Sequence, residues 1–279
     1  MRACMAMFLI LAAFTAYGDV EQKSAEHRTF AGAKKLILDN VIGSIEADGY
    51  SGSELQVEAT RTLNAESPER AEAARRDVKL DMSQSGDVVR IFVDGPFRCH
   101  CDDGHSVNYR GRRHDGYEVT YDFKLKVPFG MFLDLRTVTH GGIKLDHTVG
   151  DFELGDINSP IEMVEVSGSG NVHTINGGVK ATFAKSPAGA CSFRSINGAL
   201  DVSFPPDLSA DVRTKTFNGA LYTDFDVSAL PVEASAPERR DGKFVYRSHR
   251  VTGVRIGRGG TEMNFNTLNG NVYIRKSGR

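Results

Sequence analysis

A short motif recurs in the second half of the chain and constrains its fold more than any other feature. It joins Thr or Ser, an apolar residue, Asn and Gly to a run of alternating apolar and polar residues, with copies that begin at Thr174, Ser195, Thr216 and Thr267. One Asn-Gly between alternating runs is typical of a hairpin tip, because both residues tolerate positive φ. A motif that repeats suggests a repeat architecture instead, in which the copies occupy equivalent positions.

The spacing of the copies favours stacked coils over separate hairpins. Aligned on the glycine position, the strong and weak copies from residue 141 onward are separated by 18, 18, 21, 21 and 51 residues. Mostly apolar side chains follow two, four and six residues past the glycine, and the last of these columns holds Phe183, Phe204 and Phe225. Stacked coils require such matched columns, whereas independent hairpins do not. The sequence therefore predicts an all-β, single-domain parallel β-solenoid (β-helix) whose strands lie roughly 4.8 Å apart.

In such a solenoid each Asn-Gly pair turns a corner, since glycine supplies positive φ and Asn bonds neighbouring backbone. We expect consecutive copies to lie directly over one another, with the charged C-terminal residues covering the last coil. The apolar residue before each Asn belongs to the same alternation, and we expect it to face inward. The predicted structural corners are Asn176, Gly177, Asn197, Gly198, Asn218, Gly219, Asn269 and Gly270, and the apolar residues before Asn are Ile157, Ile175, Ile196, Phe217 and Leu268.

Three stretches carry a resemblance to a known family. They are the four motif copies, the segment YEVTYDFKLKVPFGMFLDLRT (117–137) and the segment TLNGNVYIRK (267–276). Together they resemble the bacterial putative-adhesin family, catalogued as domain of unknown function 4097. The resemblance covers about residues 36–276 and implies an exported β-solenoid with an irregular N-terminal part. It supplies no catalytic residues.

The N-terminus has the pattern of a secretory signal peptide. In residues 1–18, Arg2 precedes an apolar run from Met5 to Phe14, and small residues follow at Ala16 and Gly18. The apolar run is too short to span a bilayer, and Cys4 lies ahead of it, unlike a lipoprotein cysteine. We therefore expect cleavage after Gly18, no transmembrane segment in the mature chain, and export to the bacterial periplasm or the extracellular space.

The remaining chain divides by composition. Residues 19–35 have the character of a polar linker, and residues 36–276 form the predicted adhesin-like domain, which begins with irregular strands. Ser67 and Pro68 precede an alanine-rich, charged run that is typical of a short helix. Residues 95–116 and 226–244 lack apolar alternation and are expected to be exposed insertions.

Charge and cysteine content exclude several classes of protein. The formal net charge is −2, or −3 once Arg2 is removed with the signal peptide, which argues against nucleic acid as a partner. The mature part keeps Cys99, Cys101 and Cys191, too few for a disulfide framework. The fold must therefore depend on a hydrophobic core.

One cluster could bind a metal. Cys99, Cys101, His105 and His114 offer thiolate and imidazole ligands of the kind that zinc and copper prefer. Cys-x-Cys is not the usual zinc spacing, so a solvated loop or a disulfide to Cys191 are the alternatives. No other cofactor is predicted.

The leading hypothesis is a non-enzymatic, exported binding or structural module of the cell envelope. Its partner would be an envelope protein or a glycan, and the chain would be a monomer or an end-to-end oligomer. The alternative is a glycan-acting enzyme of the β-helix type, for which acidic pairs such as Asp146 and Asp151 could supply acid and base. A groove that combines carboxylates with Arg or Lys would favour this alternative.

Overall fold

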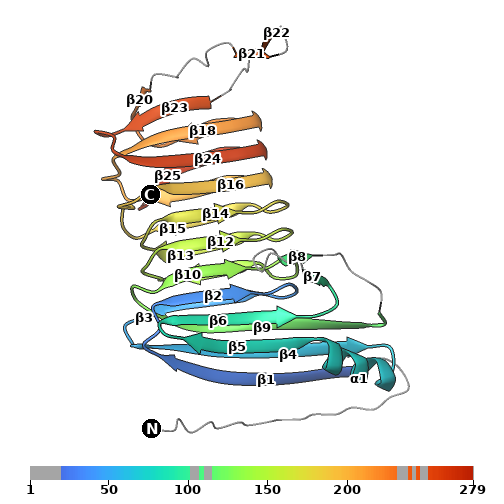
Figure 1. The fold of residues 1–279 in the computed structure, drawn as a ribbon. Coiled ribbons are helices and arrows are strands. Elements are labelled where there is room, and N and C mark those ends of the chain that lie inside the picture. The colour runs from blue at the N-terminus through green and yellow to red at the C-terminus, as the bar shows by residue number, and fades with distance from the viewer. Residues whose placement is uncertain are drawn as a thin grey trace.

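The computed structural model describes residues 20–100, 107–109, 115–230, 238–240, 243–245 and 251–278. Within these ranges the chain is all-β with one helix, and most strands belong to two large mixed sheets, here named sheet A and sheet B (Figure 1). In the same ranges no helix is long and apolar enough to cross a membrane. The all-β prediction is confirmed, whereas the predicted signal peptide, residues 1–18, lies outside the described residues.

The two sheets contain strands from all parts of the chain. Sheet A has the spatial order β1 (Val20–Ala31), β4 (Glu54–Ala65), β9 (Tyr117–Pro128), β3 (Ile45–Tyr50), β11 (Ile143–Asp146), β13 (Ile161–Val166), β15 (Val179–Phe183), β17 (Leu200–Phe204), β25 (Val272–Lys276) and β19 (Leu221–Thr223). Sheet B has the order β20 (Val227–Ala229), β23 (Val251–Ile256), β18 (Ala210–Asn218), β24 (Thr261–Asn269), β16 (Cys191–Asn197), β14 (Gly170–His173), β12 (Phe152–Gly155), β10 (Phe132–Arg136), β2 (Lys35–Asp39), β6 (Val88–Asp94) and β5 (Lys79–Ser85). Two small hairpins join β7 (Arg98–His100) to β8 (Val107–Tyr109) and β21 (Glu238–Arg240) to β22 (Lys243–Val245).

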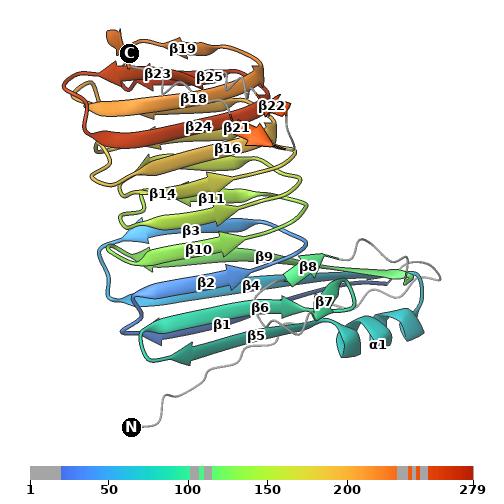
Figure 2. The same ribbon diagram turned by 45° about the horizontal axis from the view of Figure 1, so that its top comes forward.

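From β10 to β17 the chain passes alternately between the sheets. We call one strand of sheet B with the following strand of sheet A a winding. Strands of successive windings pair in parallel, with Ile143 opposite Ile161 in sheet A and Leu154 opposite Val172 in sheet B. The windings lie one over another along the molecule (Figure 2). Equivalent positions of the repeat are therefore direct neighbours.

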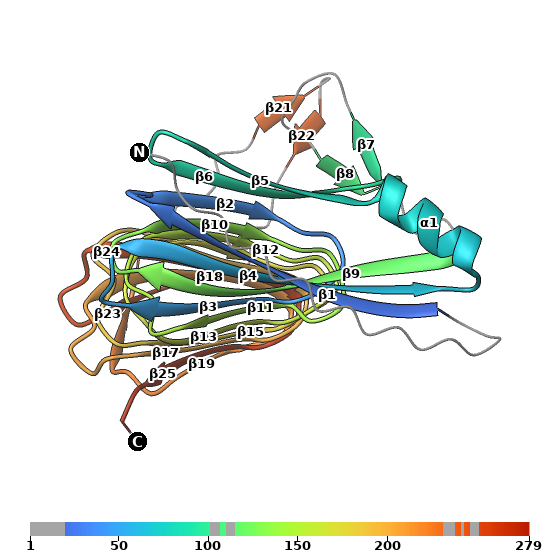
Figure 3. The same ribbon diagram turned by 90° about the horizontal axis from the view of Figure 1, so that it is seen from below.

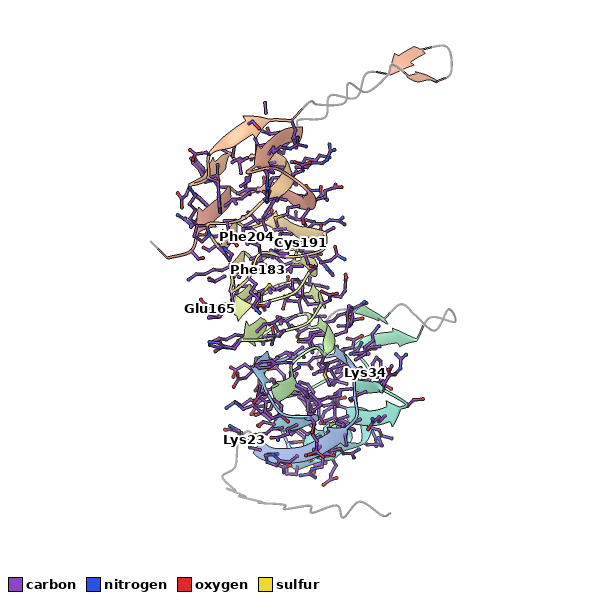
Figure 4. All side chains as sticks on the ribbon, turned by 90° about the vertical axis from the view of Figure 1, so that its left-hand side faces the viewer. Lys23, Lys34, Glu165, Phe183, Cys191 and Phe204 are labelled. Atoms are coloured by element: carbon purple, nitrogen blue, oxygen red, sulfur yellow. The ribbon has the colours of Figure 1, made fainter. Side chains whose placement is uncertain are left out.

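The core lies between the sheets and contains columns of phenyl rings. The rings of Phe183 and Phe204 stack with centroids 4.9 Å apart, and those of Phe193 and Phe265 stack at 5.1 Å. Phe183 also meets Phe193 edge-on at 6.2 Å, so the two columns interlock. Figure 4 shows Phe183 and Phe204 at successive levels of this interior. The predicted apolar alternation thus forms continuous ladders.

The order of the last windings differs from the prediction. The C-terminal winding, β24 with β25, lies between β16 with β17 and β18 with β19, as the red β24 shows in Figure 1. Lys276 is therefore opposite Phe204, and its ammonium lies 5.2 Å from the centroid of the Phe225 ring. Phe225 does not follow Phe204 in the ladder, and the C-terminal residues do not cover the end of the stack. Each repeat copy carries the same columns, so the motif does not specify which copies become neighbours.

The prediction of a polar linker at residues 19–35 is wrong. Residues 20–31 form β1, which pairs with β4 in antiparallel register from Val20 opposite Ala65 to Ala31 opposite Glu54. In β1 only Phe30 is buried, and the partly buried Val20 packs against the core. Backbone pairing holds this strand at the edge of sheet A, and such pairing leaves no apolar pattern in the sequence.

The helix prediction is confirmed. Helix α1 covers Pro68–Asp77, and the Ser67 hydroxyl caps it by accepting a hydrogen bond from the Arg70 N–H at 3.3 Å. The buried Ala71 and Ala74 face the protein, where α1 packs against β4 and β9 (Figure 3).

Both predicted insertions contain strands. At the start of residues 95–116, the buried Arg98 donates hydrogen bonds from Nη2 to the Asp39 backbone carbonyl at 2.9 Å and to Asp39 Oδ1 at 3.0 Å. In residues 226–244, β20 pairs with β23 and extends sheet B. These parts of the insertions therefore belong to the folded structure.

Candidate functional site

The predicted corner residues lie where the chain passes from sheet B to sheet A. Each Asn ends a strand of sheet B or closely follows it, and each Gly lies between that strand and the next strand of sheet A. The prediction of positive φ at these glycines is wrong, because none of Gly177, Gly198, Gly219 and Gly270 has it. A Cβ at these positions would lie 2.0 to 2.2 Å from a carbonyl oxygen of the neighbouring winding, so glycine is required for the close approach of the backbones. The Asn amides form one continuous ladder in which every Nδ2 donates to the Oδ1 of the Asn beneath. The bonds run from Asn176 to Asn158 at 3.0 Å, Asn197 to Asn176 at 2.8 Å, Asn269 to Asn197 at 2.8 Å and Asn218 to Asn269 at 2.7 Å.

A second column of hydrogen bonds lies beside the Asn ladder. The Thr or Ser that opens each motif donates its hydroxyl proton to the backbone carbonyl at the glycine position of the adjacent winding beneath it. Ser195 bonds the Gly177 carbonyl at 2.8 Å, and Thr267 bonds the Gly198 carbonyl at 3.0 Å. The motif therefore encodes a corner with two hydrogen-bond columns.

The apolar residues before Asn do not face inward as predicted. Ile175, Ile196, Leu268 and Phe217 are exposed, and Ile157 is half-buried. The alternation breaks at the corner because the preceding Thr or Ser turns its hydroxyl inward to bond the neighbouring winding. These five residues form an exposed column, here called the corner stripe.

The Asn ladder supports a first prediction. Asn197→Ala should lower the free energy of unfolding by about 1 to 2 kcal/mol, because Asn197 donates one ladder bond and accepts another. Urea denaturation would measure this change. Asn171→Ala is the control, since Asn171 donates one exposed bond to Glu153 at 2.9 Å. Equal losses for the two variants would contradict a special contribution from the ladder.

Asp156 occupies the column of inward hydroxyls. It stands level with Thr137 and Thr174 in the adjacent windings and is buried. Its Oδ1 accepts a hydrogen bond from the Ser159 N–H at 2.6 Å, whereas Oδ2 is buried with no partner in the described part of the chain. Burial raises the pKa of the Asp156 carboxyl to about 7, against the opposing effect of N–H groups of Ser159, Asn158 and Ile157. The carboxyl can therefore replace a neutral hydroxyl group only while it is protonated.

Only one of the four predicted metal ligands lies in the described part of the chain, so the metal site stays a prediction. Cys99 lies in β7, while Cys101, His105 and His114 lie outside the described residues. Among the described residues, no group of three or more His, Cys, Asp or Glu side chains could hold a metal. Cys191 is a buried free cysteine, and burial raises the pKa of its thiol to about 11. The disulfide alternative for Cys191 is therefore not supported.

A depression of about 530 Å³ lies on the outer surface of sheet A. Its lining comes from five strands, β1, β4, β9, β3 and β11. The charged lining residues are His27, Arg28, Glu46, Asp48, Glu58, Lys124, Lys126, Lys144 and Asp146. Only Asp146 among them was predicted as a site residue, because single residues from distant strands form no motif. This depression combines carboxylates with Arg and Lys, the combination that the sequence reasoning expected to favour the glycan-acting enzyme.

Opposite charges alternate across the strands of sheet A. Lys124 is opposite Glu46, which is opposite Lys144 on its other side. The same column continues through Glu162 and Lys180 beyond the depression. Within the depression Lys126 also forms an ion pair with Asp48. Cross-strand pairs of opposite charge stabilise a sheet, so the charges of the depression are largely balanced.

The upper end of sheet A carries two stacked tyrosines. The rings of Tyr222 and Tyr273 lie 5.1 Å apart, and Tyr222 is 51% exposed. The Arg275 guanidinium lies 4.8 Å from the Tyr273 ring centroid and forms a two-bond ion pair with Asp201. The two rings therefore form one aromatic surface, and the charges of Arg275 and Asp201 beside it are already paired with each other.

Comparisons with known proteins show similarity only to solved structures. No family model matches the chain, and no curated protein matches it. A putative cell adhesion protein from Clostridium sporogenes is 9% identical with a TM-score of 0.45, over 91% of this chain and 100% of that chain. A putative adhesin from Bacteroides fragilis is 10% identical with a TM-score of 0.36, over 90% and 96%. A putative lipid binding protein from Parabacteroides distasonis is 11% identical with a TM-score of 0.27, over 90% and 96%. Because these TM-scores are below 0.5, membership of the adhesin family remains a prediction.

Proposed function

We propose that the windings form a β-solenoid that is exported and acts as a non-enzymatic, adhesin-like binding module of the cell envelope. The parallel, in-register pairing from β10 to β17 supports the solenoid. The observation that carries the binding function is the charged depression on sheet A. Its ligand, on this proposal, is an envelope glycan.

The chemistry of the depression favours a ligand rich in hydroxyl groups. Four carboxylates and four Lys or Arg side chains line it, so its formal charge is balanced apart from His27. A polyanion or a polycation would gain attraction from half of these groups and repulsion from the others. Sugar hydroxyls can donate to the carboxylates and accept from the ammonium groups, so every charge can keep a hydrogen-bond partner.

Hydrolysis of a glycan is the second candidate function. Glycosidases place two carboxyl groups on either side of the scissile bond, and the depression offers Glu46, Asp48, Glu58 and Asp146. The same depression could therefore hold a substrate instead of a retained ligand. A test must measure binding and bond cleavage together.

A charge-neutral double variant tests both functions. Glu46→Gln with Lys144→Met removes one acid and one base that face each other in the depression. Glu162→Gln with Lys180→Met is the matched control, because this pair lies in the same column and does not line the depression. The probes are purified insoluble peptidoglycan and cellulose, with co-sedimentation to measure binding and a reducing-end assay to measure cleavage.

We expect the wild type and the control to sediment with peptidoglycan and the depression variant to bind at least tenfold more weakly. Equal binding by all three proteins would contradict the depression as the site, and no binding by the wild type to either probe would contradict glycan recognition. New reducing ends that appear with the wild type and disappear with the depression variant would establish hydrolysis and refute the non-enzymatic proposal.

A further inference from the structure

The C-terminal segment holds β18 on both sides. We call residues 251–276 the C-terminal clasp; it comprises β23, a short turn, β24 and β25. β23 pairs with one edge of β18 in antiparallel register, and β24 pairs with the other edge in parallel register. In Figure 1 the three strands lie next to one another near the upper end of sheet B.

The turn of the clasp passes around the first residue of β18. Ala210 is opposite Ile256 of β23 and Thr261 of β24, so residues 257–260 connect the two sides. The Ser209 hydroxyl donates to the Gly259 carbonyl at 2.9 Å and accepts from the Arg258 N–H at 3.0 Å. Gly257, Gly259 and Gly260 all have positive φ, which explains the glycine-rich sequence of this turn.

The strand β24 fills a slot whose two walls match each other. Asn269 is opposite Asn197 of β16 on one side and Asn218 of β18 on the other. In sheet A, Val272 of β25 is likewise opposite Leu200 of β17 and Leu221 of β19. The slot therefore matches β24 and β25 on both of its sides in this register.

The contacts that hold the clasp in the slot do not depend on whether the clasp and the slot belong to the same chain. They are strand pairing, the Asn ladder and the burial of side chains such as Met263, Phe265 and Ile274. Residues 230–250 connect β20 to β23, and a chain of that length can reach up to about 70 Å when extended. The same clasp from another molecule could make every one of these contacts.

We propose that the C-terminal clasp exchanges between two copies of this chain, so that β24 and β25 of each copy fill the slot of the other. An exchanged dimer keeps the hydrogen bonds and the buried area of the single molecule. Only the covalent connection differs, because each clasp then lies in the other copy. Such exchange of identical elements is a low-cost route to a dimer. The partner is a second copy because only its clasp repeats the whole set of matched columns.

Paired cysteine variants can detect the exchange in the full chain. Arg213 of β18 is opposite Asn264 of β24. Copies with Arg213→Cys and differently tagged copies with Asn264→Cys, all also carrying Cys4→Ser, Cys99→Ser and Cys101→Ser, are unfolded together, refolded over a range of protein concentrations and oxidised. We expect a disulfide-linked heterodimer on a non-reducing gel, at least tenfold more abundant than for the control pair and rising with concentration.

The control pair is Asp134→Cys on β10 and Glu153→Cys on β12, which are opposite each other in consecutive windings. Copies that carry these changes separately should give no heterodimer above background. A chain with both Arg213→Cys and Asn264→Cys should form an internal disulfide when refolded dilute, which would support the position of β24. Absence of that internal bond, absence of the heterodimer at every concentration, or equal yields from both pairs would overturn the proposal.

Discussion

Replacing Phe183 with Ala should lower the free energy of unfolding by about 3 to 5 kcal/mol, the usual range for a buried phenyl group. Phe183 is fully buried and contacts rings of both sheets, stacked on Phe204 at 4.9 Å and edge-on to Phe193 at 6.2 Å. Removal of its ring leaves a cavity between sheets that are each fixed by continuous strand pairing. The walls can therefore collapse little, which favours the upper part of the range.

Equilibrium unfolding in guanidinium chloride, followed by circular dichroism, measures this loss. Phe129→Ala is the matched control, because Phe129 is 48% exposed and its removal should cost less than about 1 kcal/mol. A loss for Phe183→Ala no larger than that of the control would contradict the interior phenyl ladder.

Replacing Asp156 with Asn should stabilise the protein at pH 8 by several kcal/mol and change little at pH 5. The folded carboxyl has its pKa raised from 3.8 to about 7, chiefly by burial, so the folded state binds its proton more tightly than the unfolded state. Stability therefore falls as pH rises from about 4 to about 7, by on the order of 4 kcal/mol in total. Asn has the same shape and stays neutral, which removes this loss.

The change at Asp156 is measured as the difference between variant and wild type at each pH. This difference cancels the contribution of His173, whose pKa is lowered by burial. Asp207→Asn provides the control, because it makes the same chemical change at an exposed carboxyl. A stabilisation that is the same at pH 5 and pH 8 would refute an ionisation cost at Asp156.

Much of the local structure could be predicted from the sequence because it depends on neighbouring residues. Period-two alternation identified the strands of the repeat, and Ser67 with Pro68 identified the start of α1. The Asn-Gly positions also lie where a strand of sheet B ends, as the repeat indicated. In each case the interactions that determine the element either recur in every copy of the motif or join residues that are close in the sequence.

The order of the windings could not be predicted in the same way. β24 matches β16 and β18 equally well in register, so the repeat itself does not say that the C-terminal copy lies between them. β1 was not predicted because an edge strand pairs through its backbone. The exposure of Ile196 was not predicted because the buried side chain next to it belongs to the polar Ser195. Each of these features depends on contacts between segments that are distant in the sequence.

The depression was also beyond prediction from the sequence. Glu46, Glu58, Lys124 and Lys144 come from four different strands, and each alone is an ordinary outward-facing charge. Their grouping follows from the insertion of β9 between β4 and β3 in sheet A. Only the tertiary arrangement shows that they surround one space.

The parallel windings from β10 to β17 give the molecule a unit of length. Each adds about 4.8 Å along the stack and contacts chiefly the winding above and the winding below. Duplication or loss of a whole unit would leave both new neighbours with matching side chains. Evolution could thus lengthen or shorten the molecule by one winding at a time without changing the sequence of either end.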